Sequence, residues 1–231
     1  MQSQSSAARR AAARVAHIAF ALLLLLPAAA PAAGPPDRAA LDAELRQILR
    51  LLPGRYAGTP AGETPPPRGE LQHKIVRIDA PQFGSTVFYH QISRDGLDST
   101  QPFQQKIYVV DRDPHRAFNR MRAFVLPMGP GPSNLERDPQ ALRQLDPARL
   151  MTFPEECAIR WSRGEQRGTW IAHVAHEQCS FDSPAFRQRV SPDMTYRLAR
   201  DSFGIQEMFY GADGRELFPP APMQRSRRVP P

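Results

Sequence analysis

The chain has 231 residues, with 30 Lys and Arg against 23 Asp and Glu, so its formal net charge at pH 7 is +7. This length is sufficient for one ordinary domain with a substantial hydrophobic core. The basic residues are scattered rather than gathered into a stripe, so the composition argues against a nucleic-acid-binding protein.

Residues 1–33 have the layout of a secretory signal peptide. An apolar run over residues 17–26 precedes several small residues, and cleavage after Ala32 fits the small-x-small rule. A basic segment without acids comes first, with Arg9, Arg10 and Arg14. The alternative, a membrane anchor, needs about 20 apolar residues, and this run is shorter. We therefore expect export to the periplasm or the extracellular space, by the Sec or twin-arginine route, with no span after cleavage.

The mature chain is predicted to begin with one long helix. Asp37 is a candidate N-cap, and apolar residues follow at helical spacing at Leu41, Leu45, Ile48, Leu49 and Leu52. Pro53-Gly54 ends the helix, and residues 57–70, rich in Pro and Gly, form a loop.

Short apolar runs bounded by turn residues then predict an antiparallel sheet. In one run Met121, Ala123 and Val125 share a face, while Arg120 and Arg122 take the other. The expected strands are residues 73–78, 86–92, 105–110, 120–126, 158–162, 169–176, 187–190, 195–200, 204–210 and 216–218. Alternation with frequent turns favours a barrel or a sandwich, and a barrel leaves no exposed edge.

Two segments interrupt or follow this pattern. Residues 133–153 form an insertion in which Asp138-Pro139 and Asp146-Pro147 each begin a short helix. The barrel domain is expected over residues 37–218. Residues 219–231 are expected to be a solvated, mobile tail rich in Pro and Arg, with Arg225, Arg227 and Arg228.

Cys157 and Cys179 are the two cysteines of the chain. An oxidising compartment and an even count favour a disulfide, which on the chain-entropy model contributes roughly 3 kcal/mol. A pair of reduced, buried thiols, or one reactive thiol, is the alternative.

No catalytic motif emerges from the residues alone. His173, His176 and Glu177 invite a metal-binding interpretation. Strand positions three apart face opposite sides of a sheet, so no metal site is predicted there. The sequence also contains no Gly-x-Ser-x-Gly elbow and no Gly-rich phosphate loop.

The order of several short motifs resembles the CpcT/CpeT family. Residues 51–56 (LLPGRY) resemble the end of its leucine-rich helix and its Gly-x-Tyr/Phe motif. Residues 87–91 (VFYHQ) are similar to its Tyr-x-Glu-Gln strand, and residues 102–108 (PFQQKIY) to its Pro-Tyr-Arg-Gln-Arg-x-Tyr strand. Cys157 stands where the family has Gly-Cys. The resemblance covers about residues 41–218.

This resemblance implies a mainly β fold, an antiparallel, calyx-like barrel similar to lipocalins, with one N-terminal helix and often dimeric. Cyanobacterial members are chromophore lyases, which join a bilin to a cysteine of a phycobiliprotein. A bilin or other tetrapyrrole is therefore the implied ligand, and a homodimer is an expected assembly. The candidate ligand-binding residues are Tyr89, Gln91, Phe103, Gln105, Lys106 and Tyr108.

The sequence departs from the family where the chemistry belongs. Gln104 and Lys106 replace the two arginines, and Lys cannot make the bidentate fork of Arg. His90 replaces the acid of the earlier strand. We therefore expect an exported barrel that binds a small amphipathic ligand. An active bilin lyase is one alternative. An envelope protein that acts through a partner, contacted by the N-terminal helix and the tail, is the other.

Overall fold

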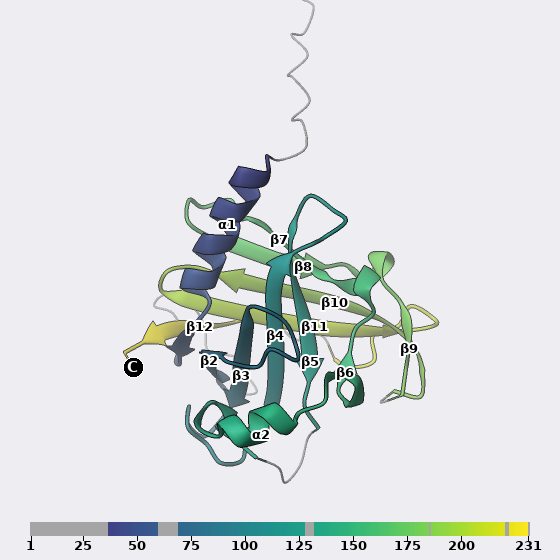
Figure 1. The fold of residues 1–231 in the computed structure, drawn as a ribbon. Coiled ribbons are helices and arrows are strands. Elements are labelled where there is room, and N and C mark those ends of the chain that lie inside the picture. The colour runs from purple at the N-terminus through teal and green to yellow at the C-terminus, as the bar shows by residue number, and fades with distance from the viewer. Residues whose placement is uncertain (1–36, 60–68, 128–131, 185, 220–221, 231) are drawn as a thin grey trace, which may run out of the picture. The chain divides into compact units, whose positions relative to one another are not determined.

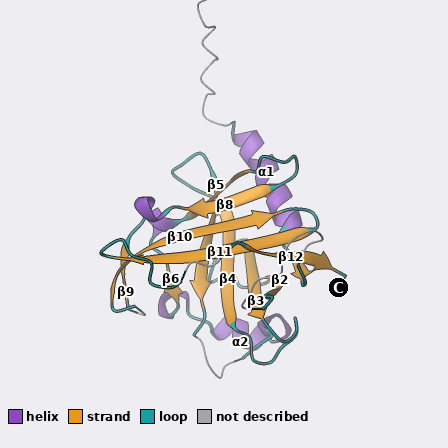
Figure 2. Cartoon of the chain, turned by 180° about the vertical axis from the view of Figure 1, so that it is seen from behind, coloured by secondary structure: helices purple, strands orange, loops and turns teal. Residues whose placement is uncertain are grey.

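The computed structural model describes residues 37–59, 69–127, 132–184, 186–219 and 222–230. Within these ranges, ten antiparallel strands close into a barrel in the order β11-β12-β1-β2-β3-β4-β5-β7-β8-β10, and β10 pairs back with β11 (Figure 1). Figure 2 shows β10 and β11 running across the direction of β3 and β4. Tilted strands on opposite walls have this relation in a barrel. The expectation of a mainly β, calyx-like barrel is confirmed.

The barrel strands are β1 (Gly54–Tyr56), β2 (Gln72–Ile78), β3 (Val87–Ser93), β4 (Gln104–Arg112), β5 (Asn119–Val125), β7 (Ile159–Arg163), β8 (Trp170–Val174), β10 (Gln188–Leu198), β11 (Ser202–Gly211) and β12 (Gln224–Val229). Two short strands are added at the side, β6 (Met151–Thr152) on β5 and β9 (Phe181–Ser183) on β10.

The predicted N-terminal helix is present as α1 (Arg38–Leu51). The Asp37 side chain accepts from the amide of Ala39 at 3.2 Å, which confirms the N-cap. Ile48 and Leu52 are fully buried in the core. The sequence did not predict the strand that follows directly, β1, because three residues are too few for an alternation to show.

Seven of the predicted strand runs coincide with β2, β3, β4, β5, β7, β8 and β11. The runs at 187–190 and 195–200 prove to be one strand, β10, which passes through Pro192. This proline is tolerated because it lies between the β9 and β8 pairings, where one edge of β10 has no partner. Residues 216–218 form no strand, and Glu216 makes one isolated bridge to Tyr210.

The expectation of a mobile tail is wrong for residues 224–229, which form β12. Strand β12 pairs with β11 on one side and β1 on the other, so it closes the barrel. Ser226 is 3% exposed, and its hydroxyl donates to the Leu71 carbonyl at 2.8 Å. Arg225 and Arg227 occupy the exposed outer face of the strand. A strand with a small buried residue between arginines lacks the apolar alternation by which strands are recognised.

The hydrophobic core has two layers because side chains alternate along a strand. Phe88, Ile92, Tyr108 and Val110 point into the barrel and belong to the larger core cluster. The outer face of β3, β4 and β5 is also apolar, and the insertion covers it. The insertion carries the 3-10 turn η1 (Leu135–Arg137) and helix α2 (Pro139–Gln144). Asp138 caps α2, which confirms the short helical insertion.

Cys157 and Cys179 form a disulfide, and no other cysteine occurs in the chain. It joins the turn η3 (Glu155–Cys157) to the segment that follows η4 (His176–Gln178). Among the described residues, no helix has the length and apolar character needed to cross a membrane. The predicted signal peptide, residues 1–33, lies outside the described residues.

Candidate functional site

The six residues predicted to bind a ligand lie in three separate places. Alternation along β3 and β4 puts Tyr89, Gln91 and Gln105 on the outer face of the barrel, under the insertion. Lys106 and Tyr108 point into the interior and are buried. Phe103 precedes β4 and is 49% exposed, with the Arg94 guanidinium 4.9 Å from its ring centre. The structure therefore does not gather these six into one pocket.

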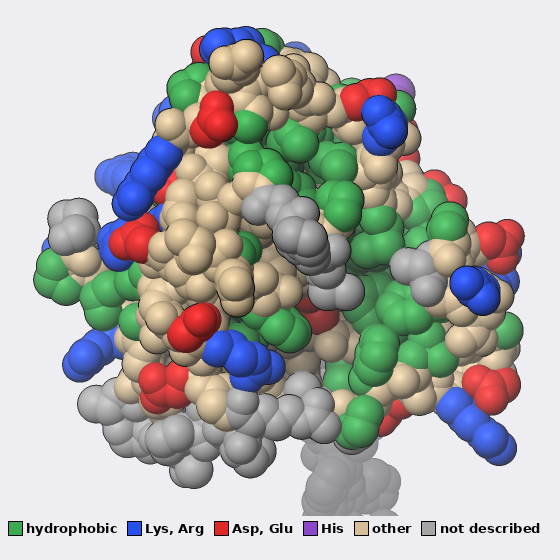
Figure 3. Space-filling model, turned by 90° about the horizontal axis from the view of Figure 1, so that it is seen from below, with side chains coloured by type: hydrophobic (Ala, Val, Ile, Leu, Met, Phe, Trp, Pro, Cys, Tyr) green, Lys and Arg blue, Asp and Glu red, His purple; other side chains and the backbone are tan. Residues whose placement is uncertain are grey.

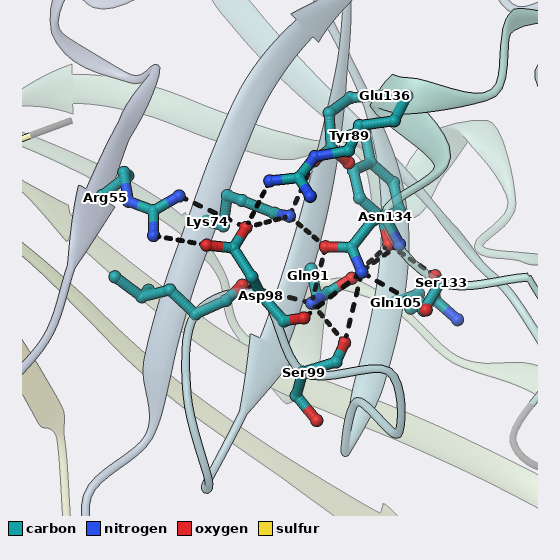
Figure 4. Close-up of polar contacts among 12 residues, drawn as sticks. Arg55, Lys74, Tyr89, Gln91, Asp98, Ser99, Gln105, Ser133, Asn134 and Glu136 are labelled. Carbon is teal, nitrogen blue, oxygen red and sulfur yellow. Dashed lines mark hydrogen bonds and ion pairs between the residues drawn. The ribbon is translucent and has the colours of Figure 1, made fainter.

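The outer-face residues belong to a polar network that fastens two loops to the barrel (Figure 4). The Tyr89 hydroxyl lies 2.8 Å from Gln91 Oε1 and 2.5 Å from Gln105 Oε1. The Gln91 amide donates to the carbonyls of Leu97 and Ser99, at 3.2 and 3.1 Å. Its oxygen accepts from the backbone amide of Asn134 at 3.0 Å. Gln91 thus holds the loop after β3 and the start of the insertion together.

A buried cation completes this network. Lys74 has a side chain only 2% exposed, and its Nζ lies 2.7 Å from Glu136 and 3.1 Å from Asp98 (Figure 4). Asp98 also pairs with Arg55 at 2.7 Å. Arg55 and then Lys74 hold the pKa of Asp98 well below its usual value. These ion pairs join β1 and β2 to the loop after β3 and to the start of the insertion.

A second polar row crosses the barrel interior. His73 Nδ1 lies 3.1 Å from His90 Nε2, and His90 Nδ1 lies 2.8 Å from the Tyr108 hydroxyl. The Tyr108 and Tyr196 rings meet edge to face at 6.0 Å. The Tyr196 hydroxyl donates to Glu207 Oε1 at 2.5 Å.

Lys106 forms an ion pair with the same oxygen, Glu207 Oε1. We call Lys106, Tyr196 and Glu207 the polar floor. The side chain of Glu207 is 19% exposed, whereas that of Lys106 is 3% exposed. Glu207 is therefore the part of the floor that solvent reaches.

Burial determines the protonation states of the histidines and tyrosines in this polar row. It lowers the pKa of His73 to about 3, with a smaller contribution from the Lys106 charge. It also puts the pKa of His90 well below its usual value. Burial and then the Glu207 charge raise the pKa of Tyr108 and of Tyr196 well above 10. At neutral pH the imidazoles and phenols are thus neutral, and the ion pair of the floor is the charged part.

A cluster of aromatic rings that are at most partly buried lies beyond the polar floor, toward the end of β11. Phe209 shares the inner face of β11 with Glu207, and its ring centre is 6.4 Å from that of Phe153 and 5.3 Å from that of Phe186. We call these three and their neighbours the aromatic mouth, which consists of Phe153, Phe181, Phe186, Phe209 and Phe218. Figure 3 shows hydrophobic side chains gathered around a hollow on this side of the protein.

The sequence missed Glu207, Tyr196 and the aromatic mouth. A usable signal was present in β11, where Glu207 stands in one row of alternate positions with the apolar residues Phe203, Ile205 and Phe209. An acid in an otherwise apolar inward row indicates a buried polar partner. Lys106 is the residue of the candidate set that belongs to the floor.

His173 and His176 do not lie on one strand as predicted. Strand β8 ends at Val174, so His176 lies in η4 and not on a strand. His173 Nε2 and His176 Nδ1 consequently both approach the Asp193 carboxylate, at 3.4 and 3.5 Å. Across the described ranges, no three His, Cys, Asp or Glu residues are placed to hold a metal ion.

No protein-family model and no curated protein matches the chain. Among solved structures, the selenomethionine form of the CRL protein of Arabidopsis superposes on it with a TM-score of 0.58. The match covers 81% of this chain and 98% of that one. The two sequences are 12% identical. The two chains share a fold. At this identity the likeness concerns the fold alone, and it supports the calyx-type barrel.

Proposed function

We propose that this chain is an exported, divergent relative of the CpcT/CpeT family that binds a small amphipathic ligand in the mouth of its barrel. The observation that carries the proposal is the aromatic mouth, which leads to an ion-paired carboxylate at its base. Ligand sites in proteins commonly combine apolar walls with a few fixed polar groups in this way.

The apolar part of the ligand packs against Phe153, Phe186 and Phe209, whose rings are only partly buried without it. The polar part meets Glu207. Its Oε1 is used by Lys106 and Tyr196, whereas its Oε2 has no partner among the described residues. An N–H donor is the group that this oxygen accepts.

The ligand stops at the polar floor. Beyond it, Tyr108, Phe203 and Trp170 fill the interior and are at most 1% exposed. The arrangement suits a ligand that enters by one end, rather than one enclosed in the centre. An open-chain tetrapyrrole, with apolar rings and pyrrole N–H groups, has the required chemistry.

A panel of biliverdin, haem, palmitate and an isoprenoid alcohol tests the proposal by thermal shift and absorbance titration. At least one should raise the melting temperature of the wild type. Glu207→Gln removes the charge but keeps the shape, and should weaken binding about tenfold. Glu44→Gln, on α1 and away from the mouth, is the matched control and should bind as the wild type does. The proposal fails if no compound stabilises the protein, or if Glu207→Gln binds as tightly as the wild type.

A bilin lyase is the alternative function for a barrel that binds such a ligand. Both cysteines are in the disulfide, so the acceptor thiol for a bilin would come from a partner protein. Incubation with phycocyanobilin and an acceptor phycobiliprotein subunit distinguishes a lyase from a binding protein. An acid-stable adduct on the acceptor supports a lyase, whereas reversible binding without an adduct supports the binding protein.

A further inference from the structure

A cleft lies at the end of the barrel where the β7–β8 turn meets the β10–β11 turn. Its volume is about 180 Å³. The residues that line it include Glu165, Trp170, Arg197, Ser202 and Arg225. None of them belongs to the aromatic mouth or the polar floor, so the cleft is a second, separate feature.

Two arginines of the outer face flank this cleft. In the register of the sheet, Gly204 of β11 pairs with Arg197 of β10 on one side and with Arg225 of β12 on the other. A Cβ at Gly204 would lie 2.9 Å from Arg225 Cγ, so the Arg225 stem lies directly over the glycine. From there Arg225 Nη2 donates to Ser202 Oγ at 3.3 Å. Glycine at position 204 thus allows Arg225 to reach the cleft.

The donors of the cleft are not all used. The side chain of Arg197 is exposed and makes no hydrogen bond or ion pair with the described part of the chain. Trp170 also lines the cleft, and its side chain lies on the inner face of the barrel beside Leu198.

We propose that this cleft binds an oxyanion the size of phosphate or sulfate. The residues that line the cleft include two arginines and one carboxylate, Glu165, so the cleft has an excess of positive charge. Guanidinium groups and a hydroxyl are donors suited to tetrahedral anion oxygens. The anion is either a free ion or the phosphate of a lipid headgroup.

Titration of the full chain with inorganic phosphate, followed by the indole N–H signal of Trp170 in NMR spectra, tests the proposal. Arg197→Gln and Arg225→Gln should each weaken binding about tenfold. Gly204→Ala leaves the charge unchanged but displaces the Arg225 stem, and should weaken binding as well. Arg215→Gln, an exposed arginine that pairs with Asp213, is the matched control.

An unshifted Trp170 signal overturns the proposal, as does an Arg197→Gln variant with wild-type affinity. Equal loss in Arg215→Gln would mean diffuse attraction to a basic protein, and would also overturn it. Cosedimentation with vesicles that contain phosphatidylglycerol identifies the source of the anion. Vesicle binding that depends on Arg197 assigns the site to a headgroup, and phosphate binding without it assigns the site to a free anion.

Discussion

His73 and His90 lie fully buried in the barrel interior and share one hydrogen bond. Phe203 meets both rings edge on, at 5.3 and 5.7 Å. In this apolar setting a charged imidazole is unfavourable, and the Lys106 charge makes it more so. The two histidines therefore couple folding to pH.

The pH dependence of unfolding tests this coupling. The unfolded chain binds a proton on His73 near pH 6.5, whereas the folded protein does so only near pH 3. The contribution to stability is full above pH 6.5 and is lost as the pH falls. Between pH 7.5 and 5.0, His73 should account for a loss of about 2 kcal/mol in urea unfolding. The His73→Gln variant should lose less free energy of unfolding over the same pH interval, when its loss is measured from its own value at pH 7.5. Equal losses in the two proteins would contradict the coupling.

Individual side chains show what the sequence could predict of the site. The family resemblance of residues 102–108 led to Lys106, whereas the resemblance of residues 87–91 placed Tyr89 and Gln91 in the site as well, although they lie on the outer face. The sequence pattern does not distinguish the two faces of β3, because the insertion buries the outer face as fully as the barrel buries the inner one. Glu207 and Tyr196 come from distant strands, and only the closed register brings them to Lys106.

Arg228 joins the last strand of the barrel to the end of the first helix. Its Nη1 donates to the Pro53 carbonyl at 2.8 Å and its Nε to the Arg200 carbonyl at 2.8 Å. Its Nη2 bonds the Leu51 carbonyl and also the Tyr56 hydroxyl, the latter at 2.6 Å. A cation at a helix C-terminus also interacts favourably with the partial negative charge of the helix dipole at that end. Strand β12 thereby fixes α1 as well as closing the sheet.

Replacing Arg228 tests whether its hydrogen bonds stabilise the protein beyond the effect of its charge alone. Arg228→Ala should lower the free energy of unfolding by about 2–3 kcal/mol, because several carbonyls lose a charged donor. Arg227→Ala removes the same charge one position earlier, from the exposed outer face. It should change stability by less than about 0.5 kcal/mol. Urea unfolding of both variants measures the difference, and similar effects would refute the assigned role.

Elements with strong local signals could be predicted, and elements defined by partners could not. The cap at Asp37 and the Asp-Pro starts of the insertion appear directly in the sequence. Strands β1, β6 and β9 are too short to show a period, and β12 carries arginines where a strand is expected to show apolar residues. Their pairing with longer neighbours makes them strands.

At the scale of the whole domain, pairing of β10 with β11 and of β12 with β1 leaves the main ring without a free edge. The disulfide holds the side of this ring near β8 by linking residues 22 positions apart. Its presence and the predicted signal peptide agree with the proposed export, because structural disulfides persist in oxidising compartments.

Removing the disulfide should weaken the fold without abolishing it. The Cys157→Ala, Cys179→Ala double variant should lose about 3 kcal/mol on the chain-entropy model. The core cluster that includes both cysteines also contains most of the interior of the barrel, so the variant should retain its β-type dichroism. Wild-type stability in the double variant, measured by urea unfolding, would show that the link contributes nothing.

An NMR titration tests most directly the claim that a ligand binds above the polar floor. Amide signals of the ¹⁵N-labelled protein would be followed while the ligand that gives the largest thermal shift is added. Shifts concentrated at Lys106, Phe153 and residues 205–211 are the predicted result. Shifts concentrated instead around Gln91 and Asn134, or none at saturation, would contradict the proposed site.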